Sequence, residues 1–399
     1  MRTELLAPAG DLERLKVAIV YGADAVYFGG KQFSLRARAS NFTLENIKEA
    51  CEFAHSYGKR VYVTVNIIPH TGDFEGLEDY LRTLEGYGVD GIICASQSIM
   101  KTGKRVAPGM EYHISTQQTT LSTAGIKYWQ KLGADRVVLG REVTMEQLKE
   151  IKPKTDMPLE VFIHGGMCAN YSGRCTISNH LTNRDANRGG CAQSCRWFYH
   201  LWQDEQLLDR DDGLLSMGSK DMCALDNLEN LLKLQVSSLK IEGRMKTAYY
   251  IASIVKGYRY AMDCYYEKGY ITDEELRKAS GLLQLAENRE TFPGFYNGQF
   301  GREGQLYTSD NTVTQTFLAN VLDYDEQTGE AVLEVRNHFE KGDKAIIMNP
   351  QGDEVPFVLE RMLDEEGNEV EIANKPMQRL RVKVPVMVNS YTFIHSERK

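Results

Sequence analysis

Short hydrophobic runs alternate with amphipathic segments from residue 3 to about residue 270. Each run is a nearly continuous stretch of apolar residues, which is typical of parallel strands that are covered on both faces. Between the runs, apolar residues recur at helical spacing, and Asp11 and Thr43 stand where the N-caps of two such helices are expected. The eight predicted strands span residues 4–8, 25–28, 60–66, 91–94, 112–115, 136–139, 159–163 and 238–242.

Glycines separate several predicted helices from the strands that follow. Gly22, Gly58, Gly88 and Gly133 each stand where a residue in the left-handed conformation ends a helix. Eight strands that alternate with helices over this length predict a (β/α) TIM-like barrel, which is an α/β fold. A doubly wound open sheet is the alternative fold. No Gly-x-Gly-x-x-Gly motif follows the first strand, so a dinucleotide site has no support.

The pattern changes after a long amphipathic helix that is predicted at residues 247–268. From about residue 311 to residue 399, apolar and polar residues alternate between tight turns, which predicts a small antiparallel β-barrel. We therefore predict a (β/α) barrel domain at residues 1–300 and a C-terminal β-barrel domain at residues 301–399. An appended domain of this kind more often binds a partner or a substrate than performs chemistry.

The composition is that of an ordinary globular protein, with 42% hydrophobic and 26% charged residues. The N-terminal residues lack the apolar run of a signal peptide, and no uninterrupted apolar stretch is long enough to span a bilayer. We therefore expect a cytoplasmic protein without membrane contact. The net charge of −8 argues against a protein that coats nucleic acid indiscriminately, although it is compatible with a local basic face.

Four of the eight cysteines lie in a segment at about residues 164–200 that interrupts the strand–helix pattern after the seventh strand. Cys168, Cys175, Cys191 and Cys195 fall within 28 residues, whereas the other four cysteines are scattered singly. Insertions after barrel strands lie at the C-terminal face of the barrel, where active sites are built. We therefore expect the cysteine segment to cover the barrel mouth.

Clustered thiolates in a reducing compartment more often hold a metal than form disulfides. Four soft thiolates select either zinc or an iron–sulfur cluster. Zinc sites usually use cysteine pairs that are two to four residues apart, and only Cys191 and Cys195 approach that spacing. The wider spacing of Cys168 and Cys175 suits a loop around a larger cubane. We therefore predict a 4Fe-4S cluster, with zinc as the less favoured occupant and free thiols as the remaining alternative.

Arginines and aromatic residues accompany the cysteines. The charged residues between the first cysteine and residue 199 are Arg174, Arg184, Asp185, Arg188 and Arg196. These arginines either offset the negative charge of thiolate-bound iron or form a surface that contacts phosphates. The aromatic residues are Tyr171, Trp197, Phe198 and Tyr199. They either stack on an unpaired RNA base or pack the loop onto the barrel.

Polar side chains at the ends of the predicted strands are candidates for the reaction, because the mouth of a barrel gathers them. As catalytic residues we predict His164, Arg141, Lys240 and Glu242. As substrate-binding residues we predict Arg36, Arg38, Asn66, Gln117 and Arg244. Several basic groups at one mouth suit an anionic organic substrate, since arginine binds carboxylates in a bidentate fork. Alternatively, Arg141–Glu142 and Glu242–Arg244 are ion pairs that hold loops, and His164 is a structural residue.

The segment at residues 160–178, EVFIHGGMCANYSGRCTIS, closely resembles the signature of the collagenase-like peptidases, peptidase family U32. Gly166 stands where that signature usually has Ser or Ala. The segments LLAPAG at residues 5–10, YGADAVY at residues 21–27 and SLKIEGRMK at residues 238–246 also look like the family. The resemblance covers the whole predicted barrel and, more loosely, the C-terminal domain.

Within that family the chain is most similar to tRNA hydroxylation proteins, through residues 36–38, 65–70, 183–191 and 195–197. The resemblance implies formation of 5-hydroxyuridine at the wobble position of certain tRNAs, dependent on prephenate and on an iron–sulfur cluster. It also implies that Cys168, Cys175, Cys191 and Cys195 are the cluster ligands. tRNA and an anionic small-molecule co-substrate are therefore the expected partners, while a homo-oligomer or a partner subunit stays an open alternative.

Two other functions compete with this interpretation. A peptidase, as the family name suggests, needs an activated nucleophile or a zinc ion with an open position. The sequence contains neither a Gly-x-Ser-x-Gly nor a His-Glu-x-x-His motif, and its clustered cysteines resemble ligands more than a single nucleophile. The second alternative is a non-catalytic RNA-binding factor in which the cluster is structural.

Overall fold

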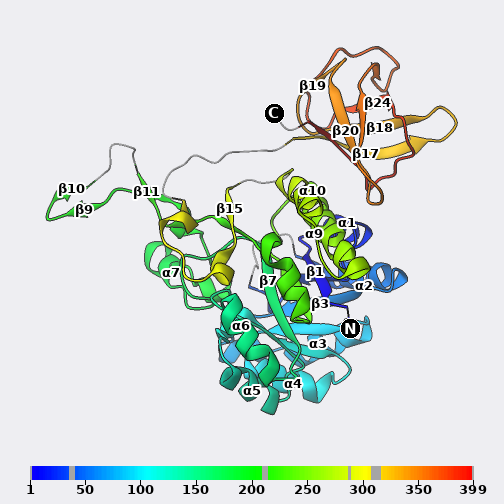
Figure 1. Ribbon diagram of the computed structural model, residues 1–399. Helices are drawn as coiled ribbons and strands as arrows, with labels where there is room; N and C mark the ends of the chain where they lie inside the picture. Colours follow the sequence, from blue (N-terminus) through cyan, green and yellow to red (C-terminus); the bar gives the residue numbers. More distant parts are fainter. Residues whose placement is uncertain (1, 36–40, 209–213, 286–288, 307–315, 398–399) are drawn as a thin grey trace.

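The computed structural model describes residues 2–35, 41–208, 214–285, 289–306 and 316–397. Eight parallel strands close into a barrel, because β14 pairs with both β1 and β7 (Figure 1). The barrel strands are β1 (Glu4–Pro8), β2 (Ala25–Gly29), β3 (Arg60–Val65), β4 (Gly91–Cys94), β5 (Glu111–Ile114), β6 (Arg136–Val138), β7 (Leu159–Gly165) and β14 (Ser238–Ile241). Each predicted strand overlaps an observed one, and the predicted TIM-like barrel is confirmed.

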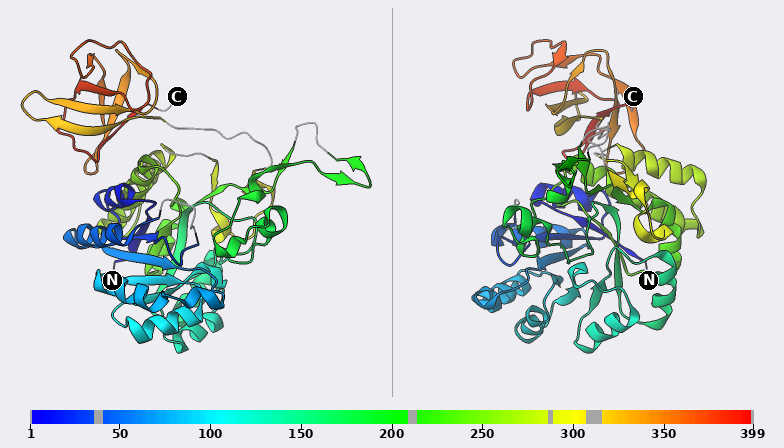
Figure 2. Two further views of the ribbon diagram at one scale, coloured as in Figure 1. Left: turned by 180° about the vertical axis from the view of Figure 1, so that it is seen from behind. Right: turned by 90° about the vertical axis from the view of Figure 1, so that its left-hand side faces the viewer.

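Helices follow the barrel strands in the chain and cover the barrel from outside (Figures 1 and 2). They are α1 (Leu12–Val20), α2 (Leu44–Ser56), α3 (Leu77–Gly86), α4 (Gln97–Val106), α5 (Thr123–Lys131), α6 (Met145–Ile151), α8 (Leu228–Lys233) and α9 (Ala248–Lys268), with α10 (Asp273–Gln284) against α9. The side chains of Asp11 and Thr43 accept hydrogen bonds from the N–H groups of Arg14 and Asn46, so both predicted N-caps are confirmed. In the described part of the chain, no helix is long and apolar enough to cross a membrane.

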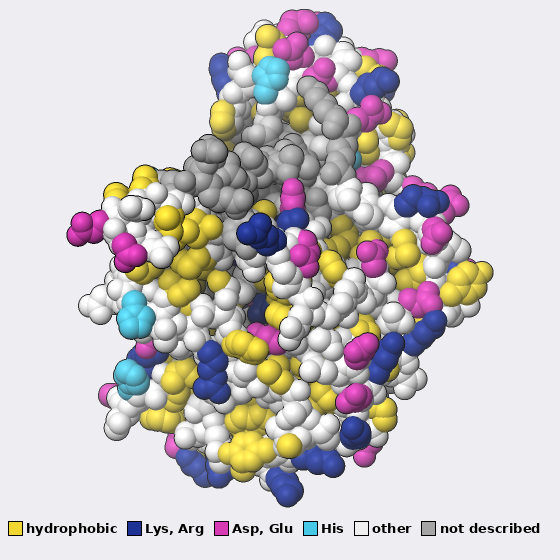
Figure 3. Space-filling model, turned by 60° about the vertical axis from the view of Figure 1, so that its left-hand side comes forward, with side chains coloured by type: hydrophobic (Ala, Val, Ile, Leu, Met, Phe, Trp, Pro, Cys, Tyr) yellow, Lys and Arg dark blue, Asp and Glu magenta, His cyan; other side chains and the backbone are white. Residues whose placement is uncertain are grey.

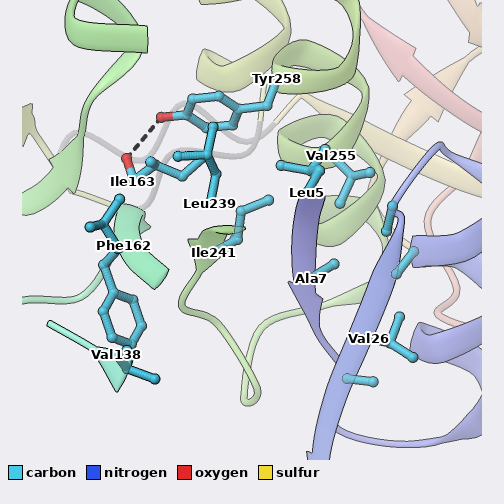
Figure 4. Packing of buried hydrophobic residues seen from close by; sticks show 14 of the residues in the cluster. Leu5, Ala7, Val26, Val138, Phe162, Ile163, Leu239, Ile241, Val255 and Tyr258 are labelled. Carbon is cyan, nitrogen blue, oxygen red and sulfur yellow. Dashed lines mark hydrogen bonds between the residues drawn. The ribbon is translucent and has the colours of Figure 1, made fainter. Parts of the chain in front are cut away.

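The outer faces of the strands and the inner faces of the helices form one hydrophobic core. Figure 4 shows Leu5 and Leu239 of the barrel packed with Val255 and Tyr258 of α9. The hydroxyl of Tyr258 donates a hydrogen bond of 2.9 Å to the carbonyl oxygen of Ile163. Since a buried tyrosine hydroxyl needs a partner, this bond fixes α9 against β7 while its ring adds apolar contact.

The inside of the barrel holds a network of charges instead of a purely apolar filling. The ammonium of Lys240 lies 2.7 Å from the fully buried carboxylate of Glu160. Arg136 lies 3.2 Å from that carboxylate and 2.6 Å from Glu4. Burial alone would raise the pKa of Glu160, but the charges of Lys240 and Arg136 outweigh it and lower the pKa. Glu160 is therefore ionised, and each of its oxygens has a cationic partner.

The chain between β7 and β14 forms an insertion that contains the four clustered cysteines. It includes α7 (Ile177–Thr182), the paired strands β8 (Phe198–Tyr199) and β11 (Leu215–Ser216), and a hairpin of β9 (Trp202–Gln203) and β10 (Gln206–Leu207). The hairpin projects away from the barrel (Figures 1 and 2). β13 (Asp221–Cys223) then returns antiparallel to the end of β7 and also pairs with β15 (Thr291–Phe292). The predicted insertion after the seventh strand is confirmed.

The C-terminal domain is an antiparallel seven-stranded sheet curved into a half-barrel around its own hydrophobic core. In spatial order its strands are β21 (Val355–Val358), β20 (Lys344–Met348), β25 (Phe393–Ser396), β17 (Phe317–Asp325), β18 (Glu330–Val335), β24 (Arg379–Lys383) and β22 (Met362–Leu363). The domain contacts α1 and α9. Just after α1, the hydroxyl of Tyr21 donates to the carbonyl oxygens of Met348 and Tyr391, at 2.8 Å each. Tyr249 of α9 stacks on Phe317.

Replacing Lys240 with methionine should destabilise the protein by roughly 3–5 kcal/mol at pH 7, because the variant leaves a buried carboxylate short of one partner. Urea unfolding measures this loss. The depressed pKa of Glu160 contributes stability above the pKa of an unfolded glutamate, and this contribution is lost as the pH falls through the folded pKa. The gap between wild type and Lys240→Met should therefore narrow at acidic pH.

Lys278→Met is the matched control, because the ion pair of Lys278 with Asp353 lies at the surface. An exposed pair contributes little to stability, so this variant should unfold close to wild type. Equal losses in the two lysine variants would contradict the assignment of a buried, mutually dependent network.

Candidate active site at the barrel mouth

The cysteine segment lies so close to the ends of the barrel strands that only glycine fits at the contacts. A Cβ atom on Gly173 would lie 2.0 Å from the carbonyl oxygen of Gln117, and one on Gly165 would lie 2.3 Å from that of Glu242. Both glycines also have positive φ, +72° and +100°. The backbone of the segment is therefore pressed against the loops that follow β5 and β14.

Polar contacts anchor the same segment. Glu142 accepts hydrogen bonds from the backbone N–H of Ser172 at 2.7 Å and from its hydroxyl at 3.1 Å. Arg188 binds both carboxylate oxygens of Asp73, at 2.6 and 3.1 Å. The hydrogen bonds from Arg188 lower the pKa of Asp73 to about 2. Glu142 and Arg188 thus hold the loop in place, and one of the arginines in the basic loop is neutralised by a partner outside it.

The four clustered cysteines lie near enough to influence one another. Desolvation raises the pKa of Cys168, Arg141 lowers it, and the charges of Cys195 and Cys191 raise it again. Desolvation likewise raises the pKa of Cys195, Arg196 lowers it, and Cys191 and Cys175 contribute to the rise. The four thiols that the sequence singles out therefore lie in one region of the insertion, within electrostatic reach of one another.

The chemistry of this donor set fits an iron–sulfur cluster. The side-chain amide of Asn170 donates to the sulfur of Cys175 at 3.5 Å, and the backbone of Ala169 lowers the pKa of Cys195. Hydrogen bonds to ligand sulfurs are a usual feature of such clusters. Within the described ranges, no three His, Cys, Asp or Glu side chains are arranged to hold a single metal ion. Cys168, Cys175, Cys191 and Cys195 could hold a cluster, in which the thiolates bind different iron atoms.

Two of the predicted catalytic residues lie together beside Cys168. The guanidinium of Arg141 is 3.4 Å from the carboxylate of Glu242 and stacks 3.7 Å from the ring centroid of Phe162. Arg141 lowers the pKa of Cys168, whereas Glu242 raises it. Arg141 therefore pairs across the mouth with a residue from another strand end, and its sequence neighbour Glu142 binds the cysteine segment.

Two of the predicted substrate-binding residues are tied to each other. The amide of Asn66 donates to the side-chain oxygen of Gln117 at 2.7 Å, and Gln117 donates back to the Asn66 carbonyl at 3.1 Å. This pair connects the ends of β3 and β5. Arg244 donates to the side chain of Asn41 at 3.2 Å. Arg36 and Arg38 lie outside the described residues.

The other two predicted catalytic residues lie elsewhere. Lys240 is inside the barrel on Glu160, as described above. His164 is buried between β7 and α9, with its ring nitrogen Nδ1 3.4 Å from the Tyr258 hydroxyl. Burial, and then the charge of Lys246, lower the pKa of His164 to about 3, so its ring is neutral at physiological pH. This environment favours a packing role for His164.

The insertion also carries an exposed aromatic surface. The exposed fractions are 62% for Tyr171 and 45% each for Trp197 and Phe198. Further exposed apolar side chains on the insertion are Leu201, Trp202, Leu207 and Leu208. Figure 3, turned to bring this side forward, shows hydrophobic side chains gathered on it. Trp197 and Phe198 are therefore accessible to solvent over almost half of their surface and are not fully covered by packing onto the barrel.

A cluster of cations was not indicated by the sequence. Lys246 and Arg289 join Arg196 around the carboxylate of Asp221. Arg196 lies in the cysteine segment and Asp221 begins β13, whereas Lys246 follows β14 and Arg289 precedes β15. No local pattern connects these positions in the chain, because only the closed barrel brings them to one place.

Comparison with known proteins follows the same division of the chain. Residues 10–306 match the description "Peptidase family U32", and residues 313–394 match "Peptidase family U32 C-terminal domain". The chain belongs to peptidase family U32.

The chain is also similar to curated proteins whose names give different activities. The chain is 43% identical over 96% of its length to tRNA hydroxylation protein P1 of Bacillus subtilis, of which it covers 92%. It is 40% identical over 67% of its length to the 23S rRNA 5-hydroxycytidine synthase of Escherichia coli, of which it covers 40%. It is 29% identical over 96% of its length to a collagenase of Porphyromonas gingivalis, of which it covers 94%.

The contact between the cysteine segment and the barrel can be tested at Gly173. Gly173→Ala should destabilise the protein by more than about 2 kcal/mol, since the new methyl group adds a clash to an unfavourable positive φ. It should also make the cysteine segment more sensitive to limited proteolysis, because the segment has to move away from the strand ends.

Gly269→Ala separates the two effects. Gly269 also has positive φ, +83°, but a Cβ atom there would meet nothing within 4 Å. This control should therefore show only the backbone cost, about 1–2 kcal/mol, and an unchanged proteolysis pattern. Identical behaviour of the two variants would argue against a tight seat for the segment.

Proposed function

We propose that this member of family U32 hydroxylates tRNA, forming 5-hydroxyuridine at the wobble position with prephenate as co-substrate and a 4Fe-4S cluster on Cys168, Cys175, Cys191 and Cys195. The observation that carries the proposal is that these four thiols lie within electrostatic reach of one another beside Arg141 and Glu242. The names of relatives that hydroxylate tRNA or rRNA support RNA as the substrate. The cytoplasm is the compartment that suits both the substrate and a thiolate-ligated cluster.

The residues around the proposed cluster site have defined tasks. A bound cluster of this kind supplies electron transfer, which we favour over oxygen-donor binding because four cysteine ligands leave no iron position open. Arg141 stabilises the thiolate of Cys168, as its effect on the pKa indicates. The amide of Asn170 orients the sulfur of Cys175. Glu242 in turn holds Arg141 in position.

RNA binding is proposed for the exposed surface of the insertion. An unpaired uridine that leaves the anticodon stack needs an aromatic face, and Tyr171 and Trp197 offer two that solvent reaches. Arg174 lies at the same surface, with its Nε atom bonded to Thr119 and the rest of its guanidinium available to a phosphate. A local contact of this kind is compatible with the acidic net charge of the whole chain.

The properties of the cysteines speak against a peptidase. A cysteine nucleophile is activated by a lowered pKa and a histidine partner. The pKa values of Cys168 and Cys195 are instead raised, and His164 is engaged with Tyr258 of α9. Proteolysis therefore stays the second candidate, supported only by the family name and by the collagenase relative.

Cys191→Ala should abolish cluster binding and tRNA hydroxylation together. Protein purified without oxygen should be brown and contain iron and acid-labile sulfide, and the variant should be colourless. Mass spectrometry of tRNA nucleosides, in a strain that lacks this gene and any paralogue, should show 5-hydroxyuridine restored by the wild type and not by the variant. Cys264→Ala is the control, because Cys264 lies on α9 outside the insertion.

Two results would contradict the proposal at separate points. A colourless wild-type protein that carries zinc would contradict the proposed iron–sulfur cluster. An unchanged amount of 5-hydroxyuridine in the deletion strain would contradict the proposed tRNA reaction. Cleavage of peptides by the wild type but not by Cys191→Ala would favour the peptidase function.

A further inference from the structure

Three cations from separate parts of the chain surround one buried carboxylate at the barrel mouth. The carboxylate of Asp221, at the start of β13, is 3.4 Å from Arg289, 3.7 Å from Lys246 and 3.9 Å from Arg196. Arg196 also donates to the carbonyl oxygen of Met167 at 3.4 Å, which places it beside the segment that leads to Cys168. The cluster therefore adjoins the proposed iron–sulfur site.

The charges in this cluster do not balance. Three positive groups share one carboxylate, and the distances from it are longer than those of the tight ion pairs elsewhere in the protein. The neighbouring Glu290 is bound to Lys220 at 2.7 Å, and Glu242 pairs with Arg141. The side chains of the three cations are 21–26% exposed, whereas Asp221 is only 6% exposed. The cations thus form the outer layer of a site that still attracts a negative group.

A buried hydroxyl beside the cluster has no partner. The oxygen of Tyr250 makes no hydrogen bond to any residue in the described ranges, although its side chain is buried. The ring of Tyr250 packs against Lys246, whose ammonium lies 4.8 Å from the ring centroid. Asp221 and Glu242 are close enough to raise the pKa of Tyr250, after burial as the main cause. A buried donor of this kind costs stability unless an acceptor completes it.

Gly166 allows the cations to approach the end of β7 closely. A Cβ atom there would lie 3.2 Å from the guanidinium of Arg196 and 3.9 Å from the carboxylate of Asp221. The first of these distances is shorter than ordinary van der Waals contact, so a larger residue would push Arg196 aside. The absence of a side chain at residue 166 therefore helps to keep Arg196 near Asp221.

We propose that Arg196, Lys246, Arg289 and the hydroxyl of Tyr250 bind a carboxylate group of a small organic acid. Two guanidinium forks match a planar carboxylate, and the ammonium and the phenol add two further donors. A phosphodiester of an RNA backbone is flanked on both sides by sugars, so it reaches the outer cations but not the buried phenol. The use of the bound acid rests on the proposed function: a site beside Cys168 suits a co-substrate of the hydroxylation.

Calorimetric titration of the anaerobically purified full chain with malonate tests this site. Arg289→Ala should weaken malonate binding about tenfold or more, which corresponds to the loss of one charge-assisted hydrogen bond. Tyr250→Phe should weaken it about fivefold and leave the fold intact, because it removes only an unpartnered oxygen. Lys220→Met is the matched control, since it removes the same charge one residue from Asp221 but takes it from Glu290.

The outcomes are separable. Unchanged malonate affinity in both Arg289→Ala and Tyr250→Phe would overturn the site, and so would an equal loss in Lys220→Met, which would indicate general electrostatics. A loss of tRNA binding alone would assign the cations to the RNA backbone and contradict the proposal. If malonate binds as expected but the protein forms no 5-hydroxyuridine, the acid-binding site is supported and the proposed function is contradicted.

Discussion

The pairing of β14 with β7 is the contact on which the rest of the molecule depends. It closes the barrel, and it places the Lys240–Glu160 ion pair across the seam. The segments that build the mouth start from these two strands. β7 leads into the cysteine segment, and β14 leads into the loop that carries Glu242 and Lys246. If the seam opened, Glu242 would separate from Arg141, and Lys246 would separate from Asp221.

Charge is distributed in two layers along this seam. Deep in the barrel, each buried carboxylate faces cations, and the network is close to neutral and tightly paired. At the mouth, cations outnumber the carboxylate that they share. The first layer specifies the fold, since an unpaired charge there is expensive. The second layer remains attractive to an anion. Lys240 on β14 thus pairs within the fold, whereas Lys246 in the loop after β14 belongs to the layer with excess positive charge.

The alternation of apolar runs and helical patterns was sufficient to predict the barrel, and the helix caps at Asp11 and Thr43 were predictable because they are local. The environments of single side chains could not be predicted in this way. Ile241 pairs with His164 after a register shift next to Lys240, so simple alternation does not say that His164 faces α9. Lys240 meets Glu160 across 80 residues of chain, and Arg188 meets Asp73 across 115. The proximity of the four cysteines could be predicted, because they are close together in the chain.

The hydrophobic core of the barrel includes residues from the other domain. Met348 and Phe393 of the half-barrel are buried in the same cluster as the strands and helices of the (β/α) barrel. The hydroxyl of Tyr21 donates to carbonyl groups of that domain, those of Met348 and Tyr391. The two units are therefore thermodynamically linked, because unfolding the half-barrel exposes apolar surface of the (β/α) barrel and takes away both carbonyl partners of the Tyr21 hydroxyl. A fragment that ends between the two domains would therefore be a barrel with an exposed apolar surface where the half-barrel had packed.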